Sequence, residues 1–233
     1  MKRIVPVDAT RGAAIAMMIV YHCCFDLNYF GIIHQDFNHQ FFWLAARAFI
    51  VSLFLIIVGI SLVLASNLGE KHFWTRQARL LVAAIAVSVG SFMMFPESYI
   101  FFGILHFILV ASLIGRVFLP FPAISLVSGI LSLASGLLYS NSLFDEPYME
   151  WIGFMTHKPY TEDYVPLFPW LGMVLIGIFI GDFIFMKSKP SWMTGSHSGL
   201  KFPSLLGRHS LAIYLIHQPI LIGMLYVLNQ YLE

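Results

Sequence analysis

Charged side chains are scarce in this chain, with Asp, Glu, Lys and Arg making up 11% of 233 residues against 59% apolar residues. About a quarter of the residues in a soluble domain are charged, so the composition excludes an ordinary soluble fold. Cysteine is nearly absent, and the two present, Cys23 and Cys24, are adjacent. Their spacing suits neither a disulfide scaffold nor a metal site. No basic stripe with interleaved aromatics occurs, so nucleic acid is not expected as a partner.

The sequence is rich in long apolar runs. A membrane-spanning helix needs about 20 apolar residues, and seven runs approach or reach that length. They cover residues 9–30, 40–66, 77–95, 98–119, 122–139, 165–186 and 206–229. We therefore expect an all-α polytopic membrane protein with about seven transmembrane helices, forming a single transmembrane domain over residues 1–233. The lipid bilayer is its first partner.

Basic residues are distributed unevenly between alternate loops. Eleven of the 13 lysines and arginines fall on one predicted face, whereas the opposite loops are acidic. Because lysine and arginine in short loops mark the cytoplasmic face, we expect the N-terminus inside and the C-terminus outside. The longest inner loop, 187–205, is expected to be a flexible connector. The longest outer loop, about 140–164, is long enough to fold over a site.

Ionisable residues inside or beside the apolar runs form the first candidate site. They are His22, Asp26, Arg47, His106 and His217. His22 and Asp26 stand at i and i+4, on one face of a helix. At a rise of about 1.5 Å per residue, His22 lies roughly 16 Å beyond Arg11, and the other members are predicted at comparable depth. Intramembrane ionisable groups are costly and usually functional.

The chemistry expected of this cluster is general-base catalysis. An imidazole takes and returns a proton near neutral pH, and a carboxylate fixes its tautomer. His22 is the first candidate for the base, with Asp26 orienting it. The alternative is a structural polar cluster in which Asp26 pairs with Arg47. His34 and His39, in the first outer loop, are weaker candidates for the same role.

A second candidate site lies at the predicted cytoplasmic ends of the helices. Its members are Asp8, Arg11, Arg76, Arg79, Arg208, His209 and Ser210. Arginines gathered at one level can bind phosphates, and Gly207 beside an expected helix start would add free N–H groups. A cation at a helix start opposes the helix dipole, which favours a bound anion there. The alternative is that these residues only obey the positive-inside rule.

Six motifs together resemble a known family. They are Asp8-Ala-Thr-Arg11-Gly12, His22-x3-Asp26-Leu-x-Tyr-Phe, Phe54-Leu-Ile-Ile-Val-Gly59-Ile-Ser61, Phe102-Gly-Ile-Leu-His106, Phe168-Pro-Trp-Leu-Gly172 and Leu206-Gly-Arg-His-Ser-Leu-Ala-Ile-Tyr214-Leu-Ile-His217-Gln-Pro219. The combination is similar to the short prokaryotic members of the heparan-alpha-glucosaminide N-acetyltransferase catalytic-domain family. The resemblance covers nearly the whole chain.

The resemblance implies a transmembrane acyltransferase that takes acetyl-CoA from the cytoplasmic side and acetylates an amine or hydroxyl of a sugar on the outer side. It places the chain in the inner membrane of a prokaryote. The lysosomal relatives carry a catalytic histidine in their first lumenal loop, and His39, or less well His34, falls near that place. The arginine-rich inner cluster would hold the CoA phosphates, and no metal is expected.

Two other functions remain open: a proton-coupled small-molecule transporter that uses the same cluster as a relay, and a non-catalytic membrane subunit. A ping-pong route through an acetyl-histidine is open beside direct transfer. The acceptor and the assembly state are undecided, and a homodimer is one of the options.

Overall fold

The computed structural model describes residues 4–188 and 198–232, and within them the chain is helical with no β-strand. The expectation of an all-α protein is therefore confirmed. Contacts gather the chain into two compact units, one of Met1–Phe54 with Ser191–Glu233 and one of Leu55–Pro190. They are called unit 1 and unit 2, and each is described by itself. Of the connector expected at 187–205, residues 189–197 lie outside the described residues, whereas residues 201–205 are helical and not an irregular connector.

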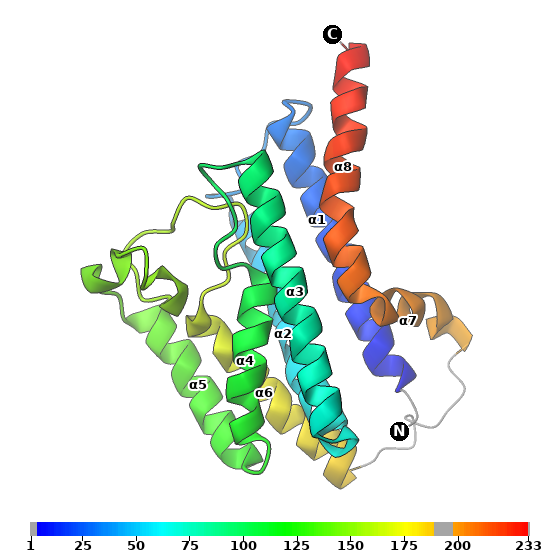
Figure 1. Ribbon diagram of the computed structural model, residues 1–233, viewed down its shortest axis with the longest axis vertical. Coiled ribbons are helices and arrows are strands. Elements are labelled where there is room, and N and C mark those ends of the chain that lie inside the picture. The colour runs from blue at the N-terminus through cyan, green and yellow to red at the C-terminus, as the bar shows by residue number, and fades with distance from the viewer. Residues whose placement is uncertain (1–3, 189–197, 233) are drawn as a thin grey trace. The chain divides into compact units, whose positions relative to one another are not determined.

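Unit 1 is built around α1 (Val5–Tyr29). A proline opens this helix, where its missing N–H is not needed, and Asp8 in the first turn complements the positive end of the helix dipole. The short helix α7 (Lys201–Arg208) and the long helix α8 (Ser210–Leu232) pack against α1 (Figure 1).

An aromatic cluster joins α1 to the start of α2 (Phe41–Ala65). Phe37, in the loop between the two helices, is only 3% exposed. Its ring stacks on Trp43 at 4.2 Å between centroids and meets Tyr21 and Phe25 edge-on at 5.7 and 5.3 Å. Burial of these large rings holds the loop against the helices.

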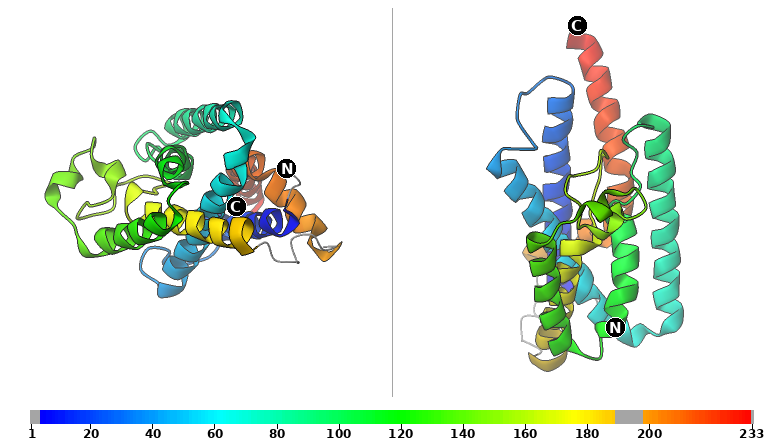
Figure 2. Two further views of the ribbon diagram at one scale, coloured as in Figure 1. Left: turned by 90° about the horizontal axis from the view of Figure 1, so that it is seen from below. Right: turned by 90° about the vertical axis from the view of Figure 1, so that its left-hand side faces the viewer.

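Unit 2 contains the rest of α2 and four further long helices. They are α3 (Glu70–Met94), α4 (Ile104–Phe118), α5 (Pro122–Leu138) and α6 (Leu167–Gly181). Figure 2 shows α3 beside α4, and α5 packs along α6. Glycine makes these contacts close, because a Cβ on Gly177 would meet the Ile56 carbonyl and one on Gly172 would meet the Gly129 carbonyl. A π-helix, Asp182–Ser188, continues α6.

Three predicted helix bounds are wrong. The helix expected from residue 77 starts at Glu70, so the predicted inner loop is largely helical. The helix expected from residue 98 starts at Ile104, because the preceding residues bond to the segment 161–165 instead. The run 206–229 is not one helix, since α7 ends at Arg208 and α8 begins at Ser210.

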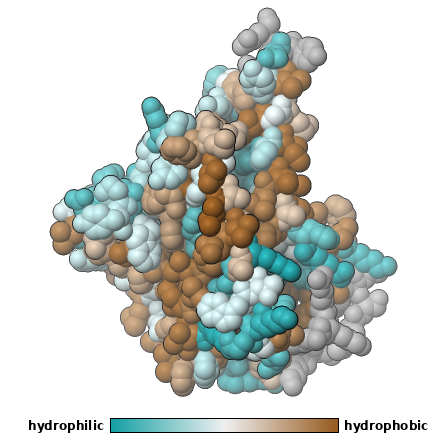
Figure 3. All heavy atoms as spheres, viewed as in Figure 1, coloured by the Kyte–Doolittle hydropathy of each residue, from teal (hydrophilic) through white to brown (hydrophobic). Residues whose placement is uncertain are grey.

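Within the described residues, four helices are long and apolar enough to cross a membrane. They are Phe41–Leu68, Glu70–Met94, Leu167–Ser188 and Ser210–Leu228. The apolar helices α4 and α5 are shorter, so the count of seven spans and the orientation of the termini stay predictions. Apolar side chains cover much of the α5 and α8 surfaces visible in Figure 3. An apolar outer surface on long helices is typical of a multi-pass membrane protein.

Candidate functional site

Two of the predicted site histidines meet in unit 1. Nε2 of His217, on α8, lies 3.2 Å from Nδ1 of His22, on α1, and their ring centroids are 4.9 Å apart. Nδ1 of His217 lies 2.6 Å from the carbonyl oxygen of Tyr214, one turn earlier in α8. His217 is only 7% exposed. The two imidazoles therefore form a part-buried, hydrogen-bonded pair.

The Tyr214 carbonyl decides which nitrogens carry protons. A carbonyl oxygen only accepts, so Nδ1 of His217 carries a hydrogen and, in the neutral ring, Nε2 is an acceptor. Nδ1 of His22 must then donate to it, and the Met18 carbonyl is a further acceptor for the His22 ring. The remaining nitrogen, Nε2 of His22, keeps its lone pair. Nε2 of His22 is therefore the basic atom of the pair, and His217 can take the proton that the His22 ring carries on Nδ1.

Asp26 lies one turn beyond His22 and is 4% exposed. Nε2 of Gln218, the residue after His217, donates to Asp26 Oδ1 at 3.2 Å. Oε1 of Gln218 is buried and has no hydrogen-bond partner among the described residues. The sequence predicts that Asp26 orients His22, whereas in the structure the Asp26 carboxylate accepts from Gln218 and the His22 ring bonds to His217. The two contacts are neighbours along both α1 and α8.

An apolar hollow of about 220 Å³ opens beside the histidine pair. His217 is its one polar lining residue. The others are Ile19, Ile213, Ile216, Ile220 and Leu221. A hollow of this kind accepts a small apolar group next to an imidazole.

Three further candidates of unit 1, His34, His39 and Arg47, lie in the loop after α1 or in the first part of α2. Nδ1 of His39 is 2.9 Å from Asp36 Oδ2, and its side chain is 84% exposed. His34 is also exposed. Arg47 is half-buried on α2 and acts electrostatically on Tyr21. His39 is therefore a solvated side chain paired with a neighbouring acid, and Arg47 borders the aromatic cluster.

The unit 1 members of the arginine cluster, Asp8, Arg11 and Arg208, meet where α1 crosses α7. Nη1 of Arg11 is 2.8 Å from Asp8 Oδ1, and Nε of Arg208 is 3.8 Å from Asp8 Oδ2. One carboxylate thus stands between two guanidinium groups, which leaves a net positive charge. Arg208 is half-open to solvent, so the cluster can still offer a guanidinium to an anion.

Two expectations about this cluster are wrong. Gly207 and Arg208 end α7 and do not start a helix, so Arg208 complements the negative end of the α7 dipole instead of opposing a positive one. Gly207 is buried, and a Cβ there would meet the Asp8 carbonyl. Its role is close helix packing. His209 caps α7, and Ser210 begins α8.

Three predicted site residues lie in unit 2. Nε2 of His106, in the first turn of α4, is 3.2 Å from Ser88 Oγ on α3. Arg76 is half-buried and Arg79 exposed, both in the first half of α3. Neither arginine belongs to the unit that holds Asp8, Arg11 and Arg208.

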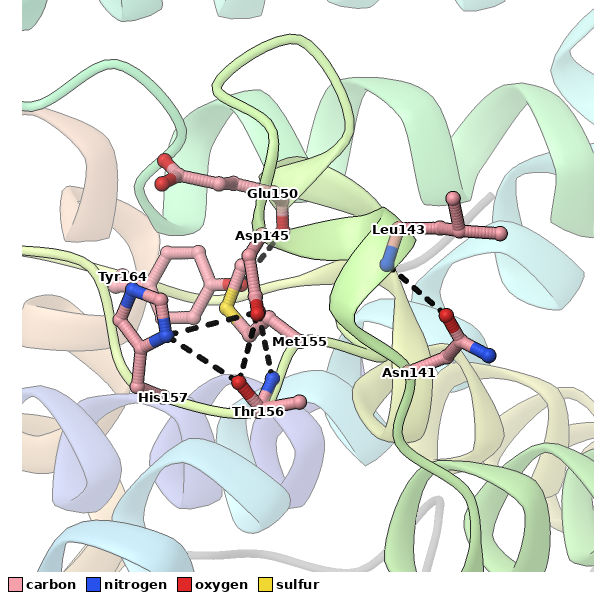
Figure 4. A network of polar contacts seen from close by, with 8 residues as sticks. All are labelled: Asn141, Leu143, Asp145, Glu150, Met155, Thr156, His157 and Tyr164. Carbon is pink, nitrogen blue, oxygen red and sulfur yellow. Dashed lines mark hydrogen bonds and ion pairs between the residues drawn. The ribbon is translucent and has the colours of Figure 1, made fainter.

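A polar network orders the long segment between α5 and α6 (Figure 4). The Asp145 carboxylate accepts from the backbone N–H and the hydroxyl of Thr156, both at 2.7 Å, and these bonds lower the pKa of Asp145. His157 Nδ1 lies 3.6 Å from the same carboxylate. Tyr164 donates to the Glu150 carbonyl at 2.6 Å, and burial raises the pKa of both Tyr164 and Glu150. The segment has a definite internal structure that its composition did not indicate.

Sequence reasoning missed two polar groups at the histidines. Ser88 was not singled out, although it is a hydroxyl within an apolar helix, which is a usable signal. Tyr214 acts through its backbone carbonyl, which any residue would supply, so only the i to i+3 spacing before His217 pointed to it. Within residues 4–188 and 198–232, no three His, Cys, Asp or Glu side chains gather as they would around a metal ion.

Comparison with known proteins gives one match. The family described as heparan-alpha-glucosaminide N-acetyltransferase, catalytic, matches residues 3–219 of the 233-residue chain. The chain itself matches no curated protein and no solved structure. The family match spans both units and includes His22, His106 and His217. The chain therefore belongs to the heparan-alpha-glucosaminide N-acetyltransferase catalytic-domain family, a family of membrane acetyltransferases.

Proposed function

We propose that this protein transfers an acetyl group from cytoplasmic acetyl-CoA to an amine or hydroxyl of a sugar-type acceptor, with His22 as the general base. The observation that carries the proposal is the His22–His217 pair, fixed by the Tyr214 carbonyl. Family membership supports the acetyl chemistry. The protein would act in the inner membrane of a prokaryote, with its N-terminus in the cytoplasm.

The chemical step begins at Nε2 of His22. This nitrogen takes the proton of the acceptor O–H or N–H while the acceptor oxygen or nitrogen bonds to the thioester carbon. The Nδ1 proton of His22 can move to His217 Nε2, so the positive charge is shared by two rings. When the tetrahedral intermediate collapses, the C–S bond breaks and the thiolate takes up a proton. A hydroxyl acceptor then gives an ester and CoA, and an ammonium acceptor gives an amide, CoA and one released proton.

The residues around the histidine pair and the arginine cluster suit the acetyl end and the phosphate end of acetyl-CoA, respectively. The apolar hollow beside His217 is large enough for the acetyl methyl and the adjoining carbons. The Gln218 amide follows His217 in the chain; one of its N–H groups donates to Asp26, and the second can donate toward a developing oxyanion. At the inner end, Arg208 and Arg11 supply positive charge for the CoA phosphates.

The direct test measures acetyl transfer by purified protein in nanodiscs, with labelled acetyl-CoA and glucosamine as the first acceptor. His22→Ala is expected to lose transfer and to keep CoA binding by mass spectrometry of the intact complex. His34→Ala, an exposed histidine in the same unit, is the matched control and should retain full activity. Full activity of His22→Ala would overturn the assignment of the base. An acetylated histidine trapped with acetyl-CoA alone would establish the ping-pong route.

A proton-coupled transporter is the second candidate, favoured by the proton-transfer geometry of the same pair. Proteoliposomes distinguish the two functions. Proton-driven uptake of solute without CoA binding would establish the carrier, whereas CoA release that depends on the acceptor would establish the transferase. A non-catalytic subunit would show neither, and its His22→Ala variant would lose thermal stability only.

A further inference from the structure

The apolar hollow of unit 1 adjoins the histidine pair. Its walls come from α1 and α8, so the whole hollow lies within unit 1. His217 is one of its lining residues and lies 3.2 Å from His22 between ring nitrogens. Ile19, which forms the α1 wall, precedes His22 by three residues and therefore lies on the same face of that helix. An acyl group held at the pair has the hollow directly beside it.

The hollow is larger than an acetyl group needs. Its volume is about 220 Å³. An apolar protein cavity of about 150 Å³ binds a benzene molecule, with its six carbons. An acetyl group has one carbon beyond its carbonyl and would leave most of the hollow empty. A wall without partner atoms forgoes dispersion contacts, so a longer acyl chain gains binding that acetyl does not.

The lining of the hollow favours a plain hydrocarbon chain. Apart from His217, its described lining residues are all isoleucine or leucine. Both ring nitrogens of His217 are engaged, Nδ1 with the Tyr214 carbonyl and Nε2 with His22. A carboxylate or hydroxyl at the end of an acyl chain would therefore be buried here without a partner, which is costly. The hollow selects against polar acyl groups.

The walls of the hollow are only partly closed. Ile216 and Ile220, both on α8, are 53% and 51% exposed. A hexanoyl chain has four more methylene groups than acetyl, and we expect about half of their surface to be buried. Full burial of one methylene tightens binding about fourfold. Half burial of four methylenes therefore gives a gain of about tenfold.

We propose that this hollow holds the hydrocarbon tail of the acyl donor, and that the protein transfers straight-chain acyl groups of about four to six carbons in addition to acetyl. The proposal rests on the proposed function, since it extends the donor of that same site. The bond from the acyl carbon to sulfur breaks, and its bond to the acceptor oxygen or nitrogen forms. The proton of the acceptor O–H or N–H passes through His22 to the CoA thiolate. Butyryl-CoA and hexanoyl-CoA are expected donors, whereas succinyl-CoA, which ends in a carboxylate, is not.

The first test measures donor binding and needs no transfer. Calorimetry with the full chain in nanodiscs gives the Kd of acetyl-, butyryl-, hexanoyl- and succinyl-CoA, and empty nanodiscs give the contribution of the bilayer. Hexanoyl-CoA should bind about tenfold more tightly than acetyl-CoA, and succinyl-CoA more weakly than butyryl-CoA. Equal affinities for acetyl-CoA and hexanoyl-CoA, or tighter binding of succinyl-CoA than of butyryl-CoA, would overturn the proposal.

Variants that fill the hollow locate the chain. Ile220→Trp should lower the hexanoyl-to-acetyl affinity ratio from about ten to about one, and Ile216→Trp does the same from a second position should the first variant fold poorly. Val227→Trp is the matched control, because Val227 is 52% exposed on α8 and is not among the residues that line the hollow. It should keep the wild-type ratio. A ratio that stays near ten in both hollow variants would show that the chain only partitions into the bilayer and would overturn the proposal. An equal fall in Val227→Trp would overturn it too.

Steady-state transfer to glucosamine separates this proposal from the proposed function. The kcat/KM for hexanoyl-CoA should exceed that for acetyl-CoA about tenfold. Transfer of acetyl without transfer of hexanoyl would overturn the longer donors alone and leave the proposed function standing. If the wild type transfers neither group, the proposed function and the longer donors both fail, whereas the affinity ratios still support or overturn the hollow as the site of the acyl chain.

Discussion

Each of the two units is stabilised internally by a different kind of contact. Unit 2 packs its helices through small residues, with Gly177 against the Ile56 carbonyl and Gly129 against Gly172. The described residues of unit 1 include a close crossing of this type, between α1 and α7, and part-buried polar pairs such as His22 with His217. Close backbone packing stabilises a membrane bundle, whereas buried ionisable groups are costly and persist where function needs them.

This difference predicts that some substitutions will affect mainly stability and others mainly activity. Substitutions at the glycine contacts should lower stability, and substitutions at the polar pairs should lower activity first. His106 is the exception in unit 2, because it is a half-buried polar side chain whose Nδ1 is buried among the helices. Four experiments test the separation, and they are ordered by the size of the expected effect.

The largest effect should come from His22→Ala in unit 1. Loss of a general base lowers rate by about 10² to 10⁴-fold, while the free energy of unfolding should fall by no more than about 1–3 kcal/mol, the cost of leaving His217 Nε2 without its donor. Steady-state acetyl transfer and thermal unfolding on the same sample measure both quantities. A large fall in melting temperature without a specific rate defect would break the comparison for unit 1.

Next in size is Gly177→Val in unit 2. The new side chain would meet the backbone of Ile56, and overpacking of this kind costs about 1–3 kcal/mol or more of unfolding free energy. Activity per folded molecule should stay near the wild-type value. Gly90→Ala, on α3 with nothing within 4 Å of its added Cβ, is the control and should be neutral or slightly stabilising.

A smaller effect is expected for Ser125→Ala, also in unit 2. The Ser125 hydroxyl is buried and donates to the Leu175 carbonyl at 2.8 Å. A side-chain hydrogen bond between membrane helices contributes about 0.6 kcal/mol on average, so the free energy of unfolding should fall by about that amount. Reversible unfolding in mixed micelles is sensitive enough to measure it. A loss as large as that of Gly177→Val would show that polar contacts, and not glycines, dominate this unit.

The smallest effect should be pH-dependent and confined to the network around Asp145. Its pKa is lowered by the bonds from Thr156, so the charged carboxylate stabilises the fold at neutral pH. That contribution is present above the unfolded-state pKa of about 4 and is lost as the pH falls through the lower folded-state value. The melting-temperature difference between wild type and Asp145→Asn should therefore shrink below about pH 4. Glu146→Gln, at an exposed neighbour, should show no such trend.

The sequence predicted the helices well because apolar runs of about 20 residues have few alternatives in a membrane protein. It failed where backbone groups bond to distant residues. The start of α4 was misplaced because Asp163, far along the chain, caps Ile104. The helix α7 was missed because its first residues belong to a stretch rich in Lys, Ser, Gly and Pro, which is typical of a connector, and its last three were assigned to the apolar run that follows.

The candidate site was predictable in residue type but not in detail. Buried histidines on two helices indicated an acid–base site, and His22 and His217 are in contact. The protonation of each ring depends on backbone carbonyls, those of Tyr214 and of Ile100 through Ser88. Carbonyls are identical in every residue, so no sequence pattern reveals which one a histidine will meet.

The cap on α4 also orders events during synthesis. The N–H of Ile104 finds its acceptor only in Asp163, 59 residues later in the chain. At about 5–20 residues per second, that partner leaves the ribosome roughly 3–12 s after Ile104 does. Over that interval the first turn of α4, with His106 in it, lacks this bond. The histidine site of unit 2 therefore takes its final form only after α5 and the segment up to residue 163 have been made.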